Sequence, residues 1–180
     1  MADSIGRQAG SAVRWQSTIL IFQAISYLGA GIVLARLLPP RDFGVVGLAA
    51  IFTEFVTLFS ELGVGAAIIQ RPKLTDAHLR VGFTLSALTG TLAAVLLFMA
   101  APVLTDGLSA RILRVLSISL FLSGLGTVSG ALLLRRMDFR RAFFVELGAY
   151  LGFFLVTVAF ALSGHGPWSL VAGILAQVLL

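Results

Sequence analysis

Three stretches of this sequence are apolar and contain no charged residue: 15–35, 81–105 and 115–134. An α-helix needs about 20 predominantly apolar residues to cross the roughly 30 Å hydrocarbon core of a membrane, and each stretch reaches that length. Two further runs are as long but contain acids: 43–70 holds Glu54 and Glu61, and 142–164 holds Glu146. Because the backbone must satisfy its own hydrogen bonds in lipid, these runs predict membrane-spanning helices.

The composition agrees with this interpretation. Hydrophobic residues make up 58% of the chain and charged residues 12%, with a mean hydropathy of +1.02, whereas roughly a quarter of an average soluble domain is charged. The net charge of +5 comes from short basic clusters between the apolar runs, so we expect no nucleic-acid partner. The sequence has no cysteine, which excludes disulfides, thiolate chemistry and Cys-type zinc sites. We expect no cofactor and no metal site.

The expected fold is all-α, a polytopic integral membrane bundle that forms a single domain over residues 1–180. A last apolar run begins at Gly166 and is still apolar at Leu180, so it is expected to be a sixth, truncated helix. The loops are short, so neighbouring helices are expected to be antiparallel. The five complete helices and the truncated sixth are expected at about 15–38, 43–70, 81–105, 111–134, 142–163 and 167–180.

Basic residues predict the orientation, because short cytoplasmic loops are enriched in Lys and Arg. One side of the expected membrane has nine: Arg7, Arg14, Arg71, Lys73, Arg80, Arg135, Arg136, Arg140 and Arg141. The other side has four: Arg36, Arg41, Arg111 and Arg114. The N-terminus is therefore expected in the cytoplasm. Each arginine is itself explained by topology, and Arg14, which borders the first span, could also meet an anionic headgroup.

The two acids of the run 43–70 are seven residues apart, which places them on one face of a helix. Gly47, Ala50, Thr57 and Gly65 share that face, whereas Leu48, Phe52, Phe55, Phe59 and Leu62 fall opposite. An ionised acid at mid-bilayer costs on the order of 3 kcal/mol, so these carboxyls should not face lipid. Two interpretations remain: cavity-lining functional acids, or a polar pair satisfied by neighbouring helices.

Other spans have weaker polar faces. In 15–38 the shared face is Gln16, Gln23, Ser26, Tyr27 and Ala30, and in 142–163 it is Glu146, Tyr150 and Thr157. Glu146 is also explained by snorkelling or by an ion pair with Arg140 or Arg141. Small residues at 119, 123, 126 and 130, and the G-x-x-x-G pairs 126/130 and 148/152, favour close helix packing or a moving interface. The candidate cavity-lining residues are Glu61, Glu54, Thr57, Gln23, Tyr27 and Arg14.

Four segments, "LARLLPPRDFGVVGLA", "LFSELGVGAAIIQRPKLT", "LLLRRMDFRR" and "GPWSLVAGILAQ", together resemble the N-terminal part of the polysaccharide biosynthesis proteins. These are Wzx-type lipid-linked oligosaccharide flippases of the multidrug/oligosaccharidyl-lipid/polysaccharide exporter superfamily. The resemblance covers nearly the whole sequence and is specific in order and spacing. The acid before "LGVGAAIIQR" is similar to the family pattern and corresponds to Glu61; Glu54 is not part of that pattern.

The resemblance implies a protein of twelve to fourteen helices, with two six-helix bundles that enclose a central cavity. It implies transport by alternating access of an undecaprenyl-pyrophosphate-linked glycan across the bacterial inner membrane. Its partners would be the lipid-linked oligosaccharide, membrane lipid, and either a missing C-terminal bundle or a second subunit. With one bundle, the chain looks like the first half of a flippase, expected to insert without transporting alone.

Three other interpretations remain. The first is a proton- or cation-coupled exporter of small molecules on the same fold, which differs in the substrate that the cavity binds. The second is a polytopic membrane enzyme of glycan assembly; such an enzyme should carry a large loop with arginine or histidine, whereas the loops here are short. The third is a membrane partner that does not transport. A flippase needs no covalent chemistry. This agrees with the sequence, which shows no set of a catalytic nucleophile and its general base.

Overall fold

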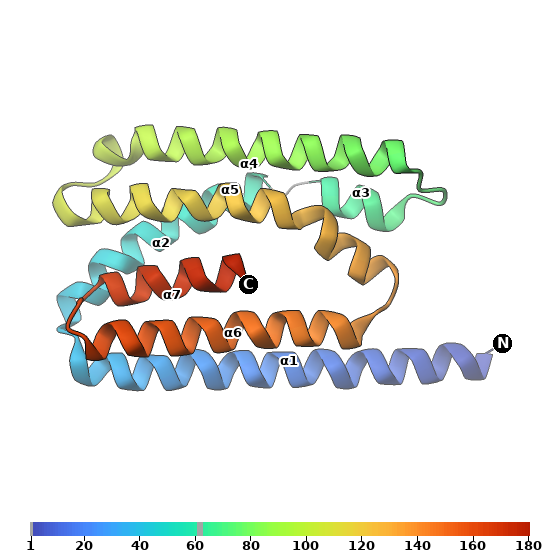
Figure 1. The fold of residues 1–180 in the computed structure, drawn as a ribbon, viewed down its shortest axis with the longest axis horizontal. Coiled ribbons are helices and arrows are strands. Elements are labelled where there is room, and N and C mark those ends of the chain that lie inside the picture. The colour runs from blue at the N-terminus through green and yellow to red at the C-terminus, as the bar shows by residue number, and fades with distance from the viewer. Residues whose placement is uncertain (1, 61–62) are drawn as a thin grey trace.

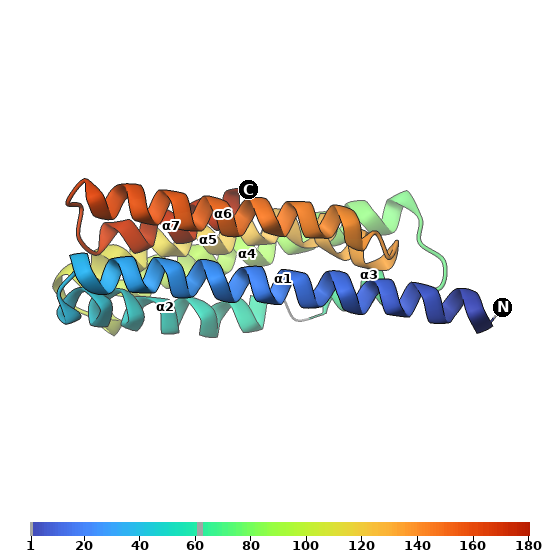
Figure 2. The same ribbon diagram turned by 90° about the horizontal axis from the view of Figure 1, so that it is seen from below.

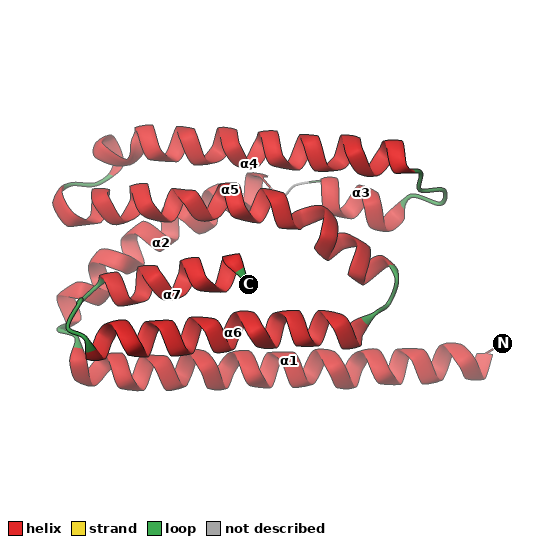
Figure 3. Cartoon of the chain, viewed as in Figure 1, coloured by secondary structure: helices red, strands yellow, loops and turns green. Residues whose placement is uncertain are grey.

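A computed structural model describes the backbone of residues 2–60 and 63–180, and the side chains of 15, 17–58 and 63–180. These residues form helices joined by short turns, with no strand in the part described (Figures 1 and 3). The all-α prediction is confirmed. The helices are α1 (Ala2–Leu37), α2 (Pro40–Ser60), α3 (Val64–Gln70), α4 (Asp76–Leu104), α5 (Gly107–Arg135), α6 (Phe139–Leu162) and α7 (Trp168–Leu179).

Long helices that follow one another in the chain run antiparallel along one axis, as the short loops predict. The N-terminus, the turn between α3 and α4, and the turn between α5 and α6 lie at one end of the bundle (Figure 1). The three other turns lie at the opposite end. In sequence, the basic clusters at 71–80 and 135–141 thus belong to the end that holds the N-terminus.

The sequence predicts one continuous helix over 43–70, but the structure has α2 and α3 with a break between them. Gly63 has a φ of 105°, which lies outside the helical region and is a backbone conformation that favours glycine. A helix cannot continue through such a residue, so α3 begins after it, at Val64. Glu61 lies outside the described residues.

Within the described residues, four helical segments are long and apolar enough to cross a membrane: Ser17–Leu37 of α1, and α4, α5 and α6. α7 is a shorter apolar helix of 12 residues. α2 has 21 residues, enough to cross at about 1.5 Å per residue, and it carries Arg41, Asp42 and Glu54. Large apolar side chains remain exposed along α1 and α4, as expected for a surface in contact with lipid. The chain is a polytopic membrane helical bundle.

The helices pack in two pairs with α7 between them: α4 and α5 are antiparallel, whereas α1 and α6 run in the same direction (Figure 1). α4 lies beside α5, and α1 lies beside α6, while α7 packs against both α6 and α5 (Figures 1 and 2). The main buried cluster joins α2, α4, α5 and α7 through Val46, Leu97, Leu116 and Val171. A second joins α1 and α6 through Leu34 and Phe153. α2 therefore packs on the α4–α5 pair.

The closest approach of two helices differs from the one that the sequence suggests. A Cβ added at Gly124 of α5 would lie 2.6 Å from the carbonyl oxygen of Ser86 and 3.2 Å from the Cα of Gly90, both in α4. By contrast, a Cβ at Gly126 or Gly130 would meet nothing within 4 Å. The G-x-x-x-G pair 126/130 is therefore not where the backbones touch; Gly90 and Gly124 allow that contact.

Candidate functional site

A groove with polar residues in its lining lies between α3 and α5 on one side and α6 and α7 on the other. Its volume is about 870 Å³. α3 contributes Gly65, Ala66 and Ile69. We call this groove the polar groove. The polar side chains in its lining are Ser123, Thr127, Glu146, Tyr150 and Gln177.

α7 forms one side of the groove. It packs against both α5 and α6, and its last turn brings Gln177 and Val178 to the groove. Glu146 and Tyr150 of α6 and Ser123 and Thr127 of α5 also line it. The groove therefore carries polar groups within the length of membrane-spanning helices.

Tyr27, a residue that the sequence selects, connects α1 to this groove. Its hydroxyl donates to Oε1 of Gln177, with an O···O distance of 3.0 Å. Its ring makes edge contacts with Tyr150, at 5.9 Å between centroids, and with Phe153, at 4.8 Å. The phenol of Tyr27 is thus held against two residues of the polar groove, and it is itself 41% exposed.

Gln23 and Ser26 of α1 are not part of the groove lining. Gln23 is half-buried one turn before Tyr27, and Ser26, from the same predicted face, is buried. Arg14 lies within α1, but its side chain is outside the described residues. Among the side chains of the predicted α1 face that the structure describes, Tyr27 is the one in contact with the groove.

Glu54 and Thr57, the described candidates of the run 43–70, are not part of the polar groove's lining. Glu54 is exposed, with exposed Ile51, Phe55 and Leu58 as its neighbours on α2. Thr57 is half-buried, and its hydroxyl donates to the carbonyl oxygen of Thr53 at 2.9 Å. The face of α2 that is buried against the bundle carries Val46, Ala49 and Thr53. That Glu54 and Glu61 line a cavity stays a prediction.

None of the five polar residues of the groove belongs to the predicted candidate set, and Glu146 and Gln177 illustrate why. Glu146 appears in the sequence only as part of a weak polar stripe with Tyr150, and its neighbours Arg140 and Arg141 favour an ion pair at the membrane edge. In the structure Arg141 pairs instead with Asp138, at 3.1 Å, and Glu146 lines the groove. Gln177 offers a signal that could have been used, since it and Ser169 are the polar residues in the run 168–180.

As far as its lining is described, the groove is a hydrogen-bonding surface with one carboxyl. The hydroxyl of Thr127 donates to the carbonyl of Ser123 at 2.9 Å, so this threonine is satisfied within α5. The side chains of Tyr150, Gln177 and Glu146 provide a phenol, an amide and an acid. The described residues contain no group of three or more His, Asp or Glu able to hold a metal ion. This arrangement suits water, sugar hydroxyls or a proton.

Comparison with known proteins shows which family the sequence matches. The model of a family described as polysaccharide biosynthesis protein matches residues 33–180. The succinoglycan biosynthesis transport protein ExoT of Rhizobium meliloti is 31% identical over 153 residues, which cover 82% of this chain and 31% of that protein. The lipopolysaccharide biosynthesis protein WzxC of Escherichia coli is 24% identical over 168 residues, covering 88% of this chain and 33% of the relative.

A third relative is the teichuronic acid biosynthesis protein TuaB of Bacillus subtilis, 27% identical over 182 residues, which cover 98% of this chain and 37% of that protein. The chain thus spans about a third of the length of the curated relatives that it matches. No solved structure matches it. The match to the family model covers most of the sequence and agrees with a multi-pass membrane bundle. The chain belongs to the polysaccharide biosynthesis protein family.

Proposed function

We propose that this bundle takes part in moving an undecaprenyl-pyrophosphate-linked oligosaccharide across the bacterial inner membrane, for export of a surface polysaccharide. The observation that carries the proposal is the polar groove: Glu146, Tyr150 and Gln177 present hydrogen-bonding groups within membrane-spanning helices of a chain of this family. Polar groups inside a membrane are costly, and they mark substrate and ion pathways. Transport of this kind requires neither a cofactor nor a catalytic nucleophile.

The groove residues have separate roles in the proposed cycle. The phenols of Tyr27 and Tyr150 and the amide of Gln177 exchange hydrogen bonds with sugar hydroxyls. The carboxyl of Glu146 repels a pyrophosphate when ionised, so its role is to take up a proton or a cation in one conformation and to release it in the other. Each role uses differences between two arrangements of the helices and involves no covalent step.

Alternating access needs a place where packed helices can rearrange, and the break between α2 and α3 offers one. Gly63 separates the two helices with its φ of 105°, and α3 forms part of the groove wall through Gly65. Broken helices in membranes are tolerated where they line a cavity, and transporters use them at substrate sites. Movement of α3 relative to α2 would therefore change the shape of the polar groove.

A complete path needs more protein than one bundle. We propose that it is supplied by a C-terminal bundle or by a second subunit, with the N-terminus on the cytoplasmic side. Gln177 and Val178, in the last turn of α7, line the polar groove. The groove would then lie at the junction between this bundle and the remainder of the path.

The test replaces the matching segment of the Rhizobium meliloti succinoglycan transport protein, which is 31% identical, with this chain. In a strain that lacks that transport protein, the chimera should restore surface succinoglycan, and the chain alone should insert without restoring it. Rescue by the chain alone would assign the second half of the path to another copy. A chimera that reaches the membrane at normal level but restores no glycan and leaves lipid-linked oligosaccharide to accumulate inside would contradict the proposal.

A further inference from the structure

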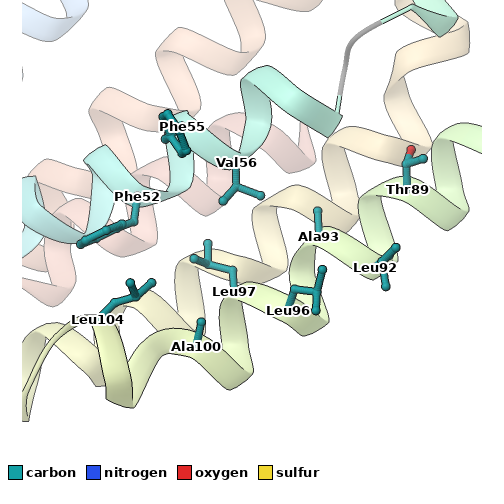
Figure 4. Close-up of a pocket in the computed structure, with 10 residues that line it drawn as sticks. All are labelled: Phe52, Phe55, Val56, Thr89, Leu92, Ala93, Leu96, Leu97, Ala100 and Leu104. Carbon is teal, nitrogen blue, oxygen red and sulfur yellow. The ribbon is translucent and has the colours of Figure 1, made fainter.

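Two apolar grooves follow α4 on the side where α2 and α3 pack. The α2–α4 groove has a volume of about 530 Å³ and is lined by Phe52, Phe55 and Val56 of α2 and by residues of α4 from Thr89 to Leu104 (Figure 4). The one hydroxyl that Figure 4 draws, that of Thr89, donates to the carbonyls of Leu85 and Ser86 at 3.0 and 3.1 Å. This groove therefore presents hydrocarbon alone to an occupant.

The α3–α4 groove continues in the same direction along α4. It has a volume of about 360 Å³, with Val64, Ala67 and Ile68 of α3 and residues of α4 from His78 to Leu85 in its lining. Leu85, the last α4 residue of this groove, and Thr89, the first of the other, are one helical turn apart. The two grooves thus lie end to end along one helix.

Their combined length exceeds what one acyl chain of a phospholipid can occupy. From His78 to Leu104 the helix rises by about 39 Å at about 1.5 Å per residue, while the hydrocarbon core of a bilayer is about 30 Å thick and one leaflet is about half of that. A chain that fills both grooves must cross the whole membrane. Long polyprenyl chains reach that far.

Charge is present at one end only. Arg71 and His78 line the α3–α4 groove, whereas no charged residue lines the α2–α4 groove. The backbone N–H of Thr75 donates to Nδ1 of His78 at 3.3 Å, so the other ring nitrogen, Nε2, carries the proton in the neutral ring. The single salt bridge among the described residues joins Arg141 to Asp138, and Arg71 therefore has no carboxylate partner there.

The backbone of Arg71 is also held in place. Its carbonyl oxygen accepts a hydrogen bond from Nη1 of Arg135 at 2.6 Å, which fixes the residue at the mouth of the α3–α4 groove. A guanidinium and an imidazole N–H at one end of a long apolar groove complement a phosphate or pyrophosphate attached to a hydrocarbon chain. A groove with a cationic group at only one end also sets the direction in which such a molecule enters.

We propose that these grooves bind the polyprenyl chain of a lipid-linked pyrophosphate, with the pyrophosphate at Arg71 and His78 and the tail along α4 toward Leu104. This inference rests on the proposed function and adds a separate subsite for the carrier's tail. The glycan would then occupy the polar groove, on the other side of α3. α3 borders the α3–α4 groove through Val64 and the polar groove through Gly65. α3 would thus separate the tail from the sugar.

The test compares two substitutions on α4 in the purified protein. Leu96 lines the α2–α4 groove and is 58% exposed, and Leu88 is 63% exposed and lines neither groove. Binding of undecaprenyl pyrophosphate, of the much shorter farnesyl pyrophosphate and of phosphatidylglycerol is measured by native mass spectrometry. Because Leu96 lies about 27 Å along the helix from His78, Leu96→Trp should weaken undecaprenyl pyrophosphate by about tenfold or more and leave farnesyl pyrophosphate unchanged. Leu88→Trp should change neither.

The charged end is tested in the same assay. Arg71→Gln should weaken both pyrophosphates, and Arg111→Gln, an exposed arginine at the opposite end of the bundle, should weaken neither. Farnesyl binding by Leu96→Trp equal to the parent's shows that this variant is folded. If Leu96→Trp binds undecaprenyl pyrophosphate like the parent, or if phosphatidylglycerol binds equally tightly with the same dependence on Leu96, the subsite is an ordinary lipid contact and the inference is wrong.

Binding and transport failures remain distinguishable. If the chimera restores surface glycan, and Leu96→Trp both binds undecaprenyl pyrophosphate and supports export in the chimera like the parent, the tail subsite alone is overturned. If binding depends on Leu96 and Arg71, but the chimera reaches the membrane and never restores glycan, the subsite is supported and the proposed function is contradicted.

Discussion

The guanidinium Nη1 of Arg135, in the last turn of α5, donates to the main-chain carbonyl oxygen of Ile68 in α3 at 2.6 Å. The same side chain also donates to the carbonyls of Ile69, Arg71 and Pro72, at 3.2, 2.6 and 3.4 Å. The last carbonyls of a helix have no partner within it, and a cation near them is favourable. Arg135 therefore caps α3, a helix of only 7 residues, and fastens it to α5.

Arg135→Lys should loosen α3 although the charge is kept. An ammonium lacks the planar fork of donors that reaches several carbonyls at once. Each hydrogen bond to a charged group contributes at most about 1.5–3 kcal/mol to stability. Hydrogen exchange of the α3 amides in detergent should speed up by tenfold or more on that scale, with α6 amides unchanged. Arg136→Lys, at the neighbouring exposed position, is the matched control. Unchanged exchange in α3 would show that apolar packing alone holds it.

The contact between α4 and α5 should be sensitive to a single methyl group. Gly124→Ala places a Cβ against the backbone of Ser86 and Gly90, where neither side can yield without moving a helix, so we expect a loss of about 1–3 kcal/mol in the free energy of unfolding. Gly126→Ala adds the same methyl group in open space and should be neutral or slightly stabilising, since alanine favours a helix more than glycine does. Unfolding in mixed micelles measures both. Equal effects would contradict the close contact.

The orientation can be tested at two turns. Asp106 and Arg140 lie near opposite ends of the bundle, in the turn before α5 and at the start of α6. Because the chain has no cysteine, one cysteine placed at either position is the only thiol. In intact cells an impermeant thiol reagent should label Asp106→Cys and leave Arg140→Cys unlabelled until the membrane is opened. Labelling of position 140 but not of 106 would reverse the predicted topology.

The sequence predicts the membrane-embedded parts of the helices better than their ends. The criterion of uncharged stretches places a helix at 81–105, whereas α4 begins at Asp76 because a helix continues past the hydrocarbon into the region where charged residues are hydrated. Thr75 and His78 form its capping box, a pattern that the sequence suggests only through Thr75. The break at Gly63 is missed for a different reason, since apolar periodicity runs through it and glycine alone does not indicate a positive φ.

The site is predicted less well because it depends on residues far apart in the sequence. Tyr27 and Gln177 are 150 positions apart, and Gly90 meets Gly124 across two helices. A helical wheel predicts which residues share a face, but it does not predict which neighbour that face meets. The sequence therefore places Tyr27 on a polar face of its own helix, favours the membrane edge for Glu146 and does not select Gln177.

The three acids of the spans should differ in a transport-competent form of the protein. Glu146 lines the polar groove, so Glu146→Gln, which keeps the shape and the hydrogen bonding but removes the charge, should lower export of surface glycan at normal expression. Glu61→Gln should also lower it, because the sequence places that acid in the cytoplasmic third of its span, where water can reach it. Glu54 is exposed on α2 among apolar side chains, and Glu54→Gln should do less.

Tyr27→Phe separates a role in transport from a role in folding. It removes the hydrogen bond to Gln177 but keeps the ring contacts with Tyr150 and Phe153, and the exposed position of the hydroxyl limits the cost to about 1 kcal/mol. If the groove carries the glycan, Tyr27→Phe and Glu146→Gln should each lower export. The unfolding temperature of each variant should stay near the parent's. If instead both variants export normally and Glu146→Leu merely lowers expression, these residues stabilise helix packing, and the transport path lies elsewhere.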